Sequence, residues 1–145
     1  LAAVAGDTQL AASWCGSEVV EFSATPAAFG PTRPFPCEEP PCPYNASALS
    51  TVCVRSLHRA EPLDACGELQ AAGMGDVVVA IGGNCSYAYK ARMAESAGAS
   101  AIIVVSDLPG GVAVEMTGSS DFVVGIPALH LSHADGQRLL SALAH

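Results

Sequence analysis

The sequence predicts an α/β fold built around one parallel β-α-β crossover. Two apolar runs, Val77–Ile81 and Ala101–Val105, are each long enough to form a fully buried strand. Between them, Tyr87–Ala97 has a helical pattern that ends at Gly98, a residue type that commonly terminates helices. Two buried strands joined by one helix pair in parallel, and such crossovers are right-handed by strong preference. We therefore expect a β-α-β unit over residues 76–105, inside a single domain that spans all 145 residues.

The N-terminal half predicts two strands and a long irregular loop. Glu18–Ala24 has the composition of a strand and runs into Thr25-Pro26, a pair that ends strands. Phe29–Pro43 holds six prolines, which remove backbone donors and fix φ, so this stretch is neither a helix nor a central strand. A short strand is expected at Val52–Val54. The Pro/Cys-rich stretch at about residues 29–53 is therefore expected to be a loop insertion in the domain.

The C-terminal part predicts short strands and a closing helix. Three strands are expected after a tight turn that begins at Asp107, namely Val112–Met116, Phe122–Val124 and Ala128–Leu131. Ser132 is the expected N-cap of the final helix, and Asp135 stands at the capping-box position. The buried face of this helix is expected to consist of Leu139, Leu140 and Leu143.

The charge of the chain excludes two classes of partner. Six Lys and Arg residues stand against fourteen Asp and Glu residues, which gives a net charge of −8. Nucleic acids and anionic membranes require clustered basic residues, so neither is an expected partner. No apolar run approaches the roughly 20 residues that a transmembrane helix needs, and no membrane insertion is expected within these residues.

Cysteines and glycosylation sequons favour an oxidising compartment. Six cysteines in so short a chain are typical of secreted proteins, and two sequons begin at Asn45 and Asn84. We expect a secreted or membrane-anchored protein, extracellular or in the lumen of the secretory pathway, that carries N-glycans. Two alternatives stay open: a signal peptide has been removed, or a transmembrane segment follows His145. A zinc site needs repeated short Cys pairs, and only Cys37 and Cys42 come near that spacing, so disulfides are expected instead.

No catalytic, metal or cofactor site is indicated. His130 and His133 lie three residues apart, but a metal site would require a third ligand such as Asp135, and two loop or cap histidines are the preferred interpretation. The motifs of serine hydrolases, zinc proteases and dinucleotide-binding proteins are missing. We therefore expect neither enzymatic activity nor a bound cofactor.

The polar residues of the crossover helix predict an ordinary surface. Lys90 and Arg92 are expected on a solvated face, with a weak ion pair between Arg92 and Glu95. Tyr87 and Tyr89 either flank a binding groove at the start of the helix or are partly buried anchors. The helix start after Gly82-Gly83-Asn84 also offers free backbone N–H groups that could hold a ligand carboxylate.

Four blocks of the sequence, in order, resemble the protease-associated (PA) domain family. They are AEPLDAC (60–66), VVVAIGGNCSYAYKARMAESAGASAIIVVSD (77–107), GIPAL (125–129) and the helix start Ser132–Leu140. The family motifs are a DP-x-x-AC turn, an RG-x-C-x-F…K turn entering a helix, an AGA-x-A strand, and an IP strand before a helix. Two departures stand out: Ile81 replaces the usual arginine, and Tyr87 replaces the usual phenylalanine.

The resemblance implies a particular architecture and a particular disulfide. PA domains consist of two small β-sheets, in a sandwich or open barrel, flanked by helices. Cys66 and Cys85 stand at two positions that the family often bridges, and the family often carries the same sequon at Asn84. The other four cysteines allow three connectivities. Of these we favour Cys37–Cys42 together with Cys15–Cys53.

The resemblance also implies the function, because PA domains are usually non-catalytic modules that bind proteins or peptides. We expect binding at the turn and helix start, through Gly82, Gly83, Ser86, Tyr87, Tyr89 and Asp107. A glycan on Asn84 would partly mask this surface and shift binding to the loop Pro31–Pro43. Two alternatives remain open. The chain is the accessory domain of a secreted protease or transmembrane ligase whose catalytic part lies outside it, or it is a structural subunit of an extracellular assembly.

Overall fold

The structure is a computed structural model that describes residues 2–4, 9–12, 20–29, 51–53, 56–70, 76–118 and 123–143. Several sequence predictions fall outside these residues: the Pro-rich loop, Phe122, Cys15, Cys37, Cys42 and Asn45. For Cys53 the structure describes the backbone alone. The pairing of these four cysteines and the insertion at 29–53 therefore stay predictions.

Eight strands and two helices make up the described fold. The strands are β1 (Ala2–Val4), β2 (Gln9–Ala12), β3 (Val20–Pro26), β4 (Thr51–Cys53), β5 (Ser56–Arg59), β6 (Asp76–Ile81), β7 (Ala101–Val105) and β8 (Ala128–Leu131). The helices are α1 (Tyr87–Ser96) and α2 (His133–Leu143). Hydrogen-bonded neighbours follow the order β4-β1-β2-β3-β8-β7-β6-β5.

Strand β3 belongs to two sheets at once. Its first residues pair antiparallel with β2, inside an antiparallel sheet formed with β1 and β4. Its last three residues pair antiparallel with β8, at the end of a five-stranded sheet in which β5 to β8 are parallel. The expected pair of small sheets flanked by helices is thus confirmed, with β3 as the strand that they share.

The β-α-β crossover over residues 76–105 is confirmed. Strand β6 pairs in parallel with β7, and α1 connects them. Ser86 caps the start of α1, and its Oγ accepts a hydrogen bond from the backbone N–H of Tyr89 at 3.2 Å. The helix stops as predicted, with Gly98 in the left-handed region at φ 94°.

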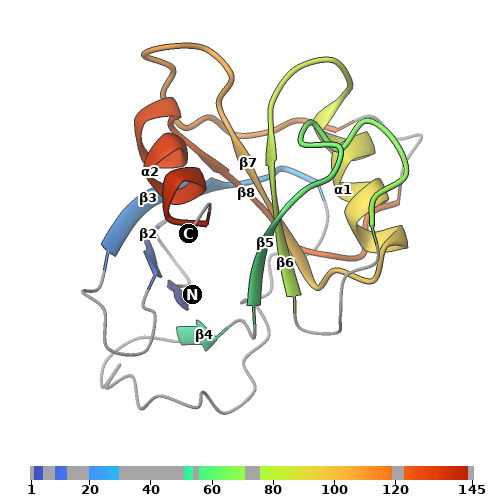
Figure 1. Ribbon diagram of the computed structural model, residues 1–145, viewed down its shortest axis with the longest axis horizontal. Helices are drawn as coiled ribbons and strands as arrows, with labels where there is room; N and C mark the ends of the chain where they lie inside the picture. The colour runs from blue at the N-terminus through green and yellow to red at the C-terminus, as the bar shows by residue number, and fades with distance from the viewer. Residues whose placement is uncertain are drawn as a thin grey trace.

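Two apolar cores lie on opposite faces of the parallel strands. Successive residues of a strand point to opposite faces, and every residue of β7 is buried. Ala101, Ile103 and Val105 pack under α2, while Ile102 and Val104 pack under α1. Figure 1 shows the two helices on opposite sides of these strands. A strand buried on both faces explains why the sequence shows a continuous apolar run rather than an alternating one.

The closing helix forms as the sequence predicts. Ser132 Oγ accepts a hydrogen bond from the backbone N–H of Asp135 at 3.2 Å, which is the N-cap geometry. Leu139 and Leu140 are buried in the core under α2, with Leu143 packed against it. Gly136 lies so close to β7 that a Cβ on it would overlap the side chain of Val105.

The strand expected at Val112–Met116 is wrong. Residues 111–118 form no strand, and residues 123–124, the described part of the expected Phe122–Val124 strand, form none either. The backbone of this segment is bound at single points: the N–H of Val114 donates to His130 Nδ1 at 3.0 Å, and the carbonyl of Met116 accepts from Ala28 at 2.8 Å. One partner is a side chain and the other is a single backbone N–H just after β3, so no ladder of strand hydrogen bonds forms.

Candidate functional site

The approach turn, residues 60–70, lies against the end of β6. The N–H of Ala60 donates to the carbonyl of Val79 at 2.8 Å, and the N–H of Ile81 donates to the carbonyl of Leu63 at 3.0 Å. These bonds bring Cys66 beside the turn that leads from β6 into α1. The approach turn and the helix start therefore meet at one end of the parallel strands.

A disulfide between Cys66 and Cys85 fixes this junction. Its Cα atoms are 5.7 Å apart, within the range that disulfides require. The two cysteines are 19 residues apart in the sequence, and closing a loop of that length stabilises a fold by about 3 kcal/mol in the chain-entropy model. The pairing that the family resemblance implied is the one that the structure contains.

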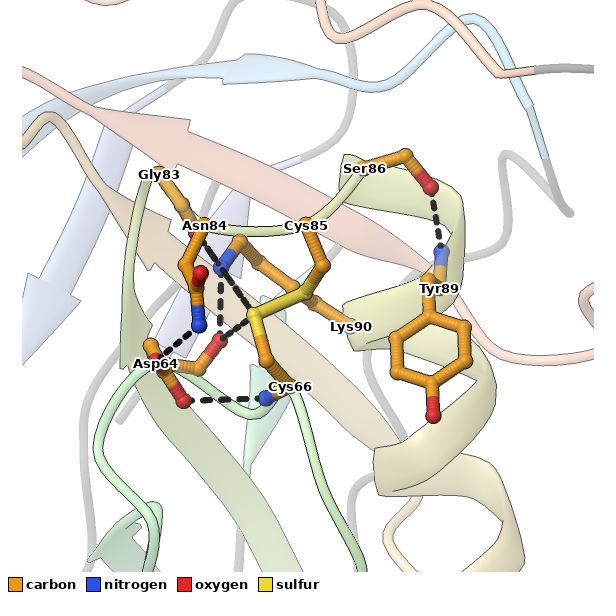
Figure 2. Close-up of a disulfide and its surroundings, with 8 residues drawn as sticks. All are labelled: Asp64, Cys66, Gly83, Asn84, Cys85, Ser86, Tyr89 and Lys90. Carbon is orange, nitrogen blue, oxygen red and sulfur yellow. Dashed lines mark hydrogen bonds between the residues drawn. A yellow bond between two sulfur atoms is a disulfide. The ribbon is translucent and has the colours of Figure 1, made fainter.

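Lys90 is completely buried behind this disulfide, so the prediction of a solvated lysine is wrong. Its side chain runs back from α1 and places Nζ among three acceptors (Figure 2). Nζ donates to the carbonyl oxygens of Asp64 and Gly83, both at 2.6 Å, and lies 3.4 Å from Cys66 Sγ. Three acceptors match the three N–H bonds of an ammonium group, and short bonds of this kind are typical of a charged donor.

The charge on Lys90 is set by opposing influences. Burial lowers its pKa, while the carboxylates of Asp64 and Asp107 raise it and so favour the ammonium form. Two further polar residues of α1, Arg92 and Glu95, also bind backbone rather than each other. Arg92 donates to the carbonyl of Val123 at 3.2 Å, and Glu95 accepts from the N–H of Gly125 at 3.0 Å. The hydrogen bonds of Arg92 and Glu95 thus run to the loop before β8 instead of forming the expected ion pair.

Asp64 connects the approach turn to Asn84. One carboxylate oxygen accepts from the backbone N–H of Cys66 at 3.0 Å, and the other accepts from Asn84 Nδ2 at 3.0 Å. The hydrogen bond from the Cys66 backbone is the main cause that lowers the pKa of Asp64, and the bond from Asn84 lowers it further. Asn84 is exposed and has φ 68°, a left-handed conformation that Asn tolerates better than most residues. The turn is thus held by a side-chain pair in addition to the disulfide.

An open depression of about 330 Å³ lies at the start of α1. It is lined by Cys66, Asn84, Cys85, Ser86 and Tyr89, and we call it the α1-end depression. Ser86 and Tyr89 were expected to bind, and both line it. The hydroxyl of Ser86 already accepts the Tyr89 N–H, which leaves fewer free donors here than a bare helix start would offer.

Three other expected binding residues, Gly82, Gly83 and Asp107, lie beside the depression and pack against each other. Gly82 is buried, and its N–H donates to the carbonyl of Val105 at 2.8 Å. A Cβ on Gly82 or Gly83 would lie 2.9 or 2.8 Å from a carboxylate oxygen of Asp107. These two glycines therefore permit the close approach of Asp107 rather than line the depression.

Tyr87 points into the protein, where it contacts His130. The two rings meet edge to face, with centroids 5.6 Å apart and planes at 73°. His130 is 1% exposed, and burial lowers its pKa, opposed by Asp107. His133 Nδ1 lies 3.0 Å from the carbonyl oxygen of Ser106. No group of three His, Cys, Asp or Glu residues within the described ranges could hold a metal ion.

The profile of the PA domain family matches residues 49–139. The chain belongs to the PA domain family. The matched region includes the approach turn, the disulfide, α1 and most of α2. In the family motif the helix entry ends in a lysine, and Lys90 stands at that position. The lysine of this motif is the sequence signal that marks Lys90 as different from an ordinary surface lysine.

Two individual proteins are similar to this PA domain. Signal peptide peptidase-like 3 of Arabidopsis thaliana is 36% identical over 80 residues, which cover 54% of this chain and 15% of the relative. A solved structure of BSAP, a zinc aminopeptidase from Bacillus subtilis, has a TM-score of 0.53 at 19% identity, covering 96% of this chain and 29% of that one. At this low identity, the similarity to the aminopeptidase structure shows a shared fold and nothing more. The chain thus spans a minor part of either protein.

None of the helices that the structure describes has the length and apolarity needed to cross a bilayer.

Proposed function

We propose that this PA domain is a non-catalytic module that binds a protein or peptide at the α1-end depression. The observation that carries the proposal is the depression itself, which combines one aromatic side chain with the polar groups of Asn84 and Ser86. Pockets for small molecules bury most of the ligand surface, and an open hollow cannot do so. The depression therefore suits a projecting side chain or loop of a protein partner better than a small molecule. The acidic chain favours a neutral or basic segment as the partner.

The rigidity of the depression supports this proposal. Its floor is fixed by the disulfide, by the three contacts of Lys90 Nζ, and by the Asp64–Asn84 hydrogen bond (Figure 2). A surface that is already ordered loses less conformational entropy when a partner binds, which raises affinity. Binding sites on loops held by a rigid scaffold are the usual arrangement in such modules.

The cellular setting that we propose is the lumen of the secretory pathway or the cell exterior. A disulfide that persists requires an oxidising environment, and the relative named as a signal peptide peptidase-like protein is consistent with a secretory or membrane context. Asn84 is exposed, and a glycan on Nδ2 would leave one N–H to donate to Asp64. Glycosylation at Asn84 is therefore compatible with the turn and remains part of the proposal together with Asn45. Because a glycan on Asn84 would partly mask the depression, binding at the depression is proposed for the chain that lacks this glycan.

A second function is favoured by the comparisons: the domain is the accessory part of a longer protease-related protein. Both similar proteins have names that denote peptidases or peptidase-like proteins, and the chain covers only 15% and 29% of their lengths. In that case the depression would bind a substrate segment or a neighbouring domain of the same protein. Both functions place the binding surface at α1.

The test is an NMR titration of the ¹⁵N-labelled domain with peptides selected from a display library. We expect selected peptides to shift the amide signals of Ser86 and Tyr89, and the Tyr89→Ala variant to weaken binding about tenfold, as loss of an aromatic contact does. Gln137→Ala is the matched control, because Gln137 is exposed on α2 across the sheet. Shifts confined to α2, or equal binding by Tyr89→Ala, would rule out the α1-end depression.

A further inference from the structure

The disulfide and the buried lysine together point to a reaction that ligand binding does not use. Cys66 and Cys85 both line the α1-end depression, and Lys90 Nζ lies 3.4 Å from Cys66 Sγ. We propose that Cys66–Cys85 is an exchangeable disulfide, in which an external dithiol attacks Cys85 Sγ and Cys66 leaves as a thiolate beside the Lys90 ammonium. This proposal does not depend on the binding of any partner.

The surroundings of the two sulfur atoms select the one that is attacked. A thiolate approaches a disulfide sulfur from the side opposite its partner sulfur. Around Cys66 Sγ lie Lys90 Nζ at 3.4 Å and the carbonyl oxygens of Asp64 and Gly83 at 3.5 and 3.6 Å. Figure 2 shows these groups on the side of Cys66 that faces away from Cys85. These groups therefore block a thiolate from attacking Cys66 Sγ. Attack on Cys85 Sγ, from the side of the depression, remains.

The environment of Cys66 also favours it as the leaving group. A cation within about 4 Å stabilises a thiolate and lowers the pKa of the corresponding thiol. A thiol of lower pKa leaves faster in thiol–disulfide exchange. The carbonyl oxygens of Asp64 and Gly83 and the carboxylates of Asp64 and Asp107 oppose a negative charge here, but the two carbonyls are already bound to the ammonium. The ammonium is as close to Cys66 Sγ, at 3.4 Å, as the two carbonyl oxygens are, at 3.5 and 3.6 Å, and it carries a full charge where each carbonyl carries a partial one.

The exchange is balanced in two steps. In the first, one thiolate of the dithiol forms a bond to Cys85 Sγ, the Cys66–Cys85 bond breaks, and its electron pair goes to Cys66. In the second, the other thiolate of the dithiol attacks its own partner sulfur, and Cys85 leaves as a thiolate. The dithiol loses two electrons and its two protons, and both cysteines become reduced. The product lacks the covalent attachment between the approach turn and the start of α1, and the Asp64–Asn84 and Lys90–Asp64 hydrogen bonds then hold that wall of the depression.

The first experiment maps the attacked sulfur in the unaltered chain. The oxidised protein is exposed briefly to glutathione, quenched with acid, and digested for mass spectrometry, because a monothiol forms the mixed disulfide without resolving it. We expect glutathione on Cys85 and a free thiol at Cys66. Glutathione mainly on Cys66, or no reaction before the protein is unfolded with guanidinium, would overturn the proposal.

A second experiment tests the part played by Lys90. In the protein reduced by dithiothreitol, the alkylation rate of Cys66 as a function of pH is expected to give a pKa below the value of about 8.5 for a free cysteine. Lys90→Met should reduce the rate of opening by dithiothreitol about tenfold, whereas Lys90→Arg, which keeps the cation, should stay near the wild-type rate. A purely structural lysine would leave Cys66 with an ordinary pKa, and that result would overturn the proposal even if Lys90→Met did not fold.

Discussion

The two helices cover opposite faces of the same strands, yet different forces hold them in place. Helix α2 contributes large apolar side chains, Leu139 and Leu140, to its core. Helix α1 buries mainly alanines, Ala88, Ala91 and Ala94, together with the charged Lys90. The α2 side is thus held by apolar burial, and the α1 side has a covalent bond and a buried cation in addition.

This difference explains the position of the candidate site. An alanine buries much less apolar area than a leucine, so the burial of α1 contributes less stability per residue than the burial of α2. The Cys66–Cys85 disulfide and the Lys90 contacts offset that deficit at the start of α1. The disulfide, together with the neighbouring Asn84 and Ser86, leaves sulfur and polar atoms at the surface, where the depression lies. The proposed recognition surface therefore includes the two cysteines that attach α1.

The largest expected effect comes from weakening the apolar side. Leu139→Ala should lower the free energy of unfolding by about 3 to 4 kcal/mol, because it leaves a cavity where the leucine side chain is fully buried. Urea denaturation followed by circular dichroism measures the loss, with Gln137→Ala as the exposed control on the same helix. Amide signals around the depression should stay unchanged under native conditions. A loss below about 1 kcal/mol would contradict the importance assigned to this core.

The next effect comes from removing the covalent attachment on the other side. Replacing Cys66 and Cys85 together by alanine should lower the free energy of unfolding by about 3 kcal/mol, through the greater entropy of the unfolded chain. Hydrogen exchange should accelerate in the approach turn and the first turn of α1 by more than the general increase that the lower global stability causes in α2. If exchange accelerated equally in both helices, the two sides would not be held independently.

The smallest effect is a pH dependence of the unfolding free energy that originates on the α1 side. The pKa of His130 is lowered in the folded state by burial, so the folded protein favours the neutral ring. Its contribution to stability is complete above the ordinary pKa of 6.5 and is lost as the pH falls toward the folded pKa. The unfolding midpoint in urea should therefore decrease between about pH 7.5 and pH 5.5. His130→Leu should flatten that decrease, and an unchanged slope in this variant would assign the pH dependence to other groups.

Local sequence patterns predicted the central unit and the final helix. The apolar runs at 77–81 and 101–105, Gly98 after the helix, and Ser132 as a cap are all signals that act within a few residues. The Cys66–Cys85 pairing came from the family resemblance. No local pattern could give it, because it depends on how distant turns meet in space.

The failures of prediction also have physical reasons. Strands β1, β2 and β5 are only three or four residues long, which is too short for a recognisable alternation of apolar and polar residues. They are defined by their pairing with other strands, which the sequence does not reveal. Lys90 was expected in water, because lysine is rarely buried unless it is paired. Its burial depends on two carbonyl groups, one of them 26 residues away in the sequence, that no helical pattern reveals. Val112–Met116 has the composition of a strand, but it has no neighbouring strand to pair with in the described structure.

The contact between Gly136 and Val105 has a consequence for engineering this molecule. The first residue of α2, His133, donates its backbone N–H to the carbonyl of Gly111 at 2.9 Å, and its ring meets the carbonyl of Ser106. Any side chain added at Gly136 would push α2 away from β7 and pull on the loop of residues 106–111. That loop carries Asp107, which packs against the turn beside the depression. Substitutions at Gly136 would therefore shift the loop that carries Asp107, and with it the turn beside the proposed binding surface, from the opposite side of the molecule.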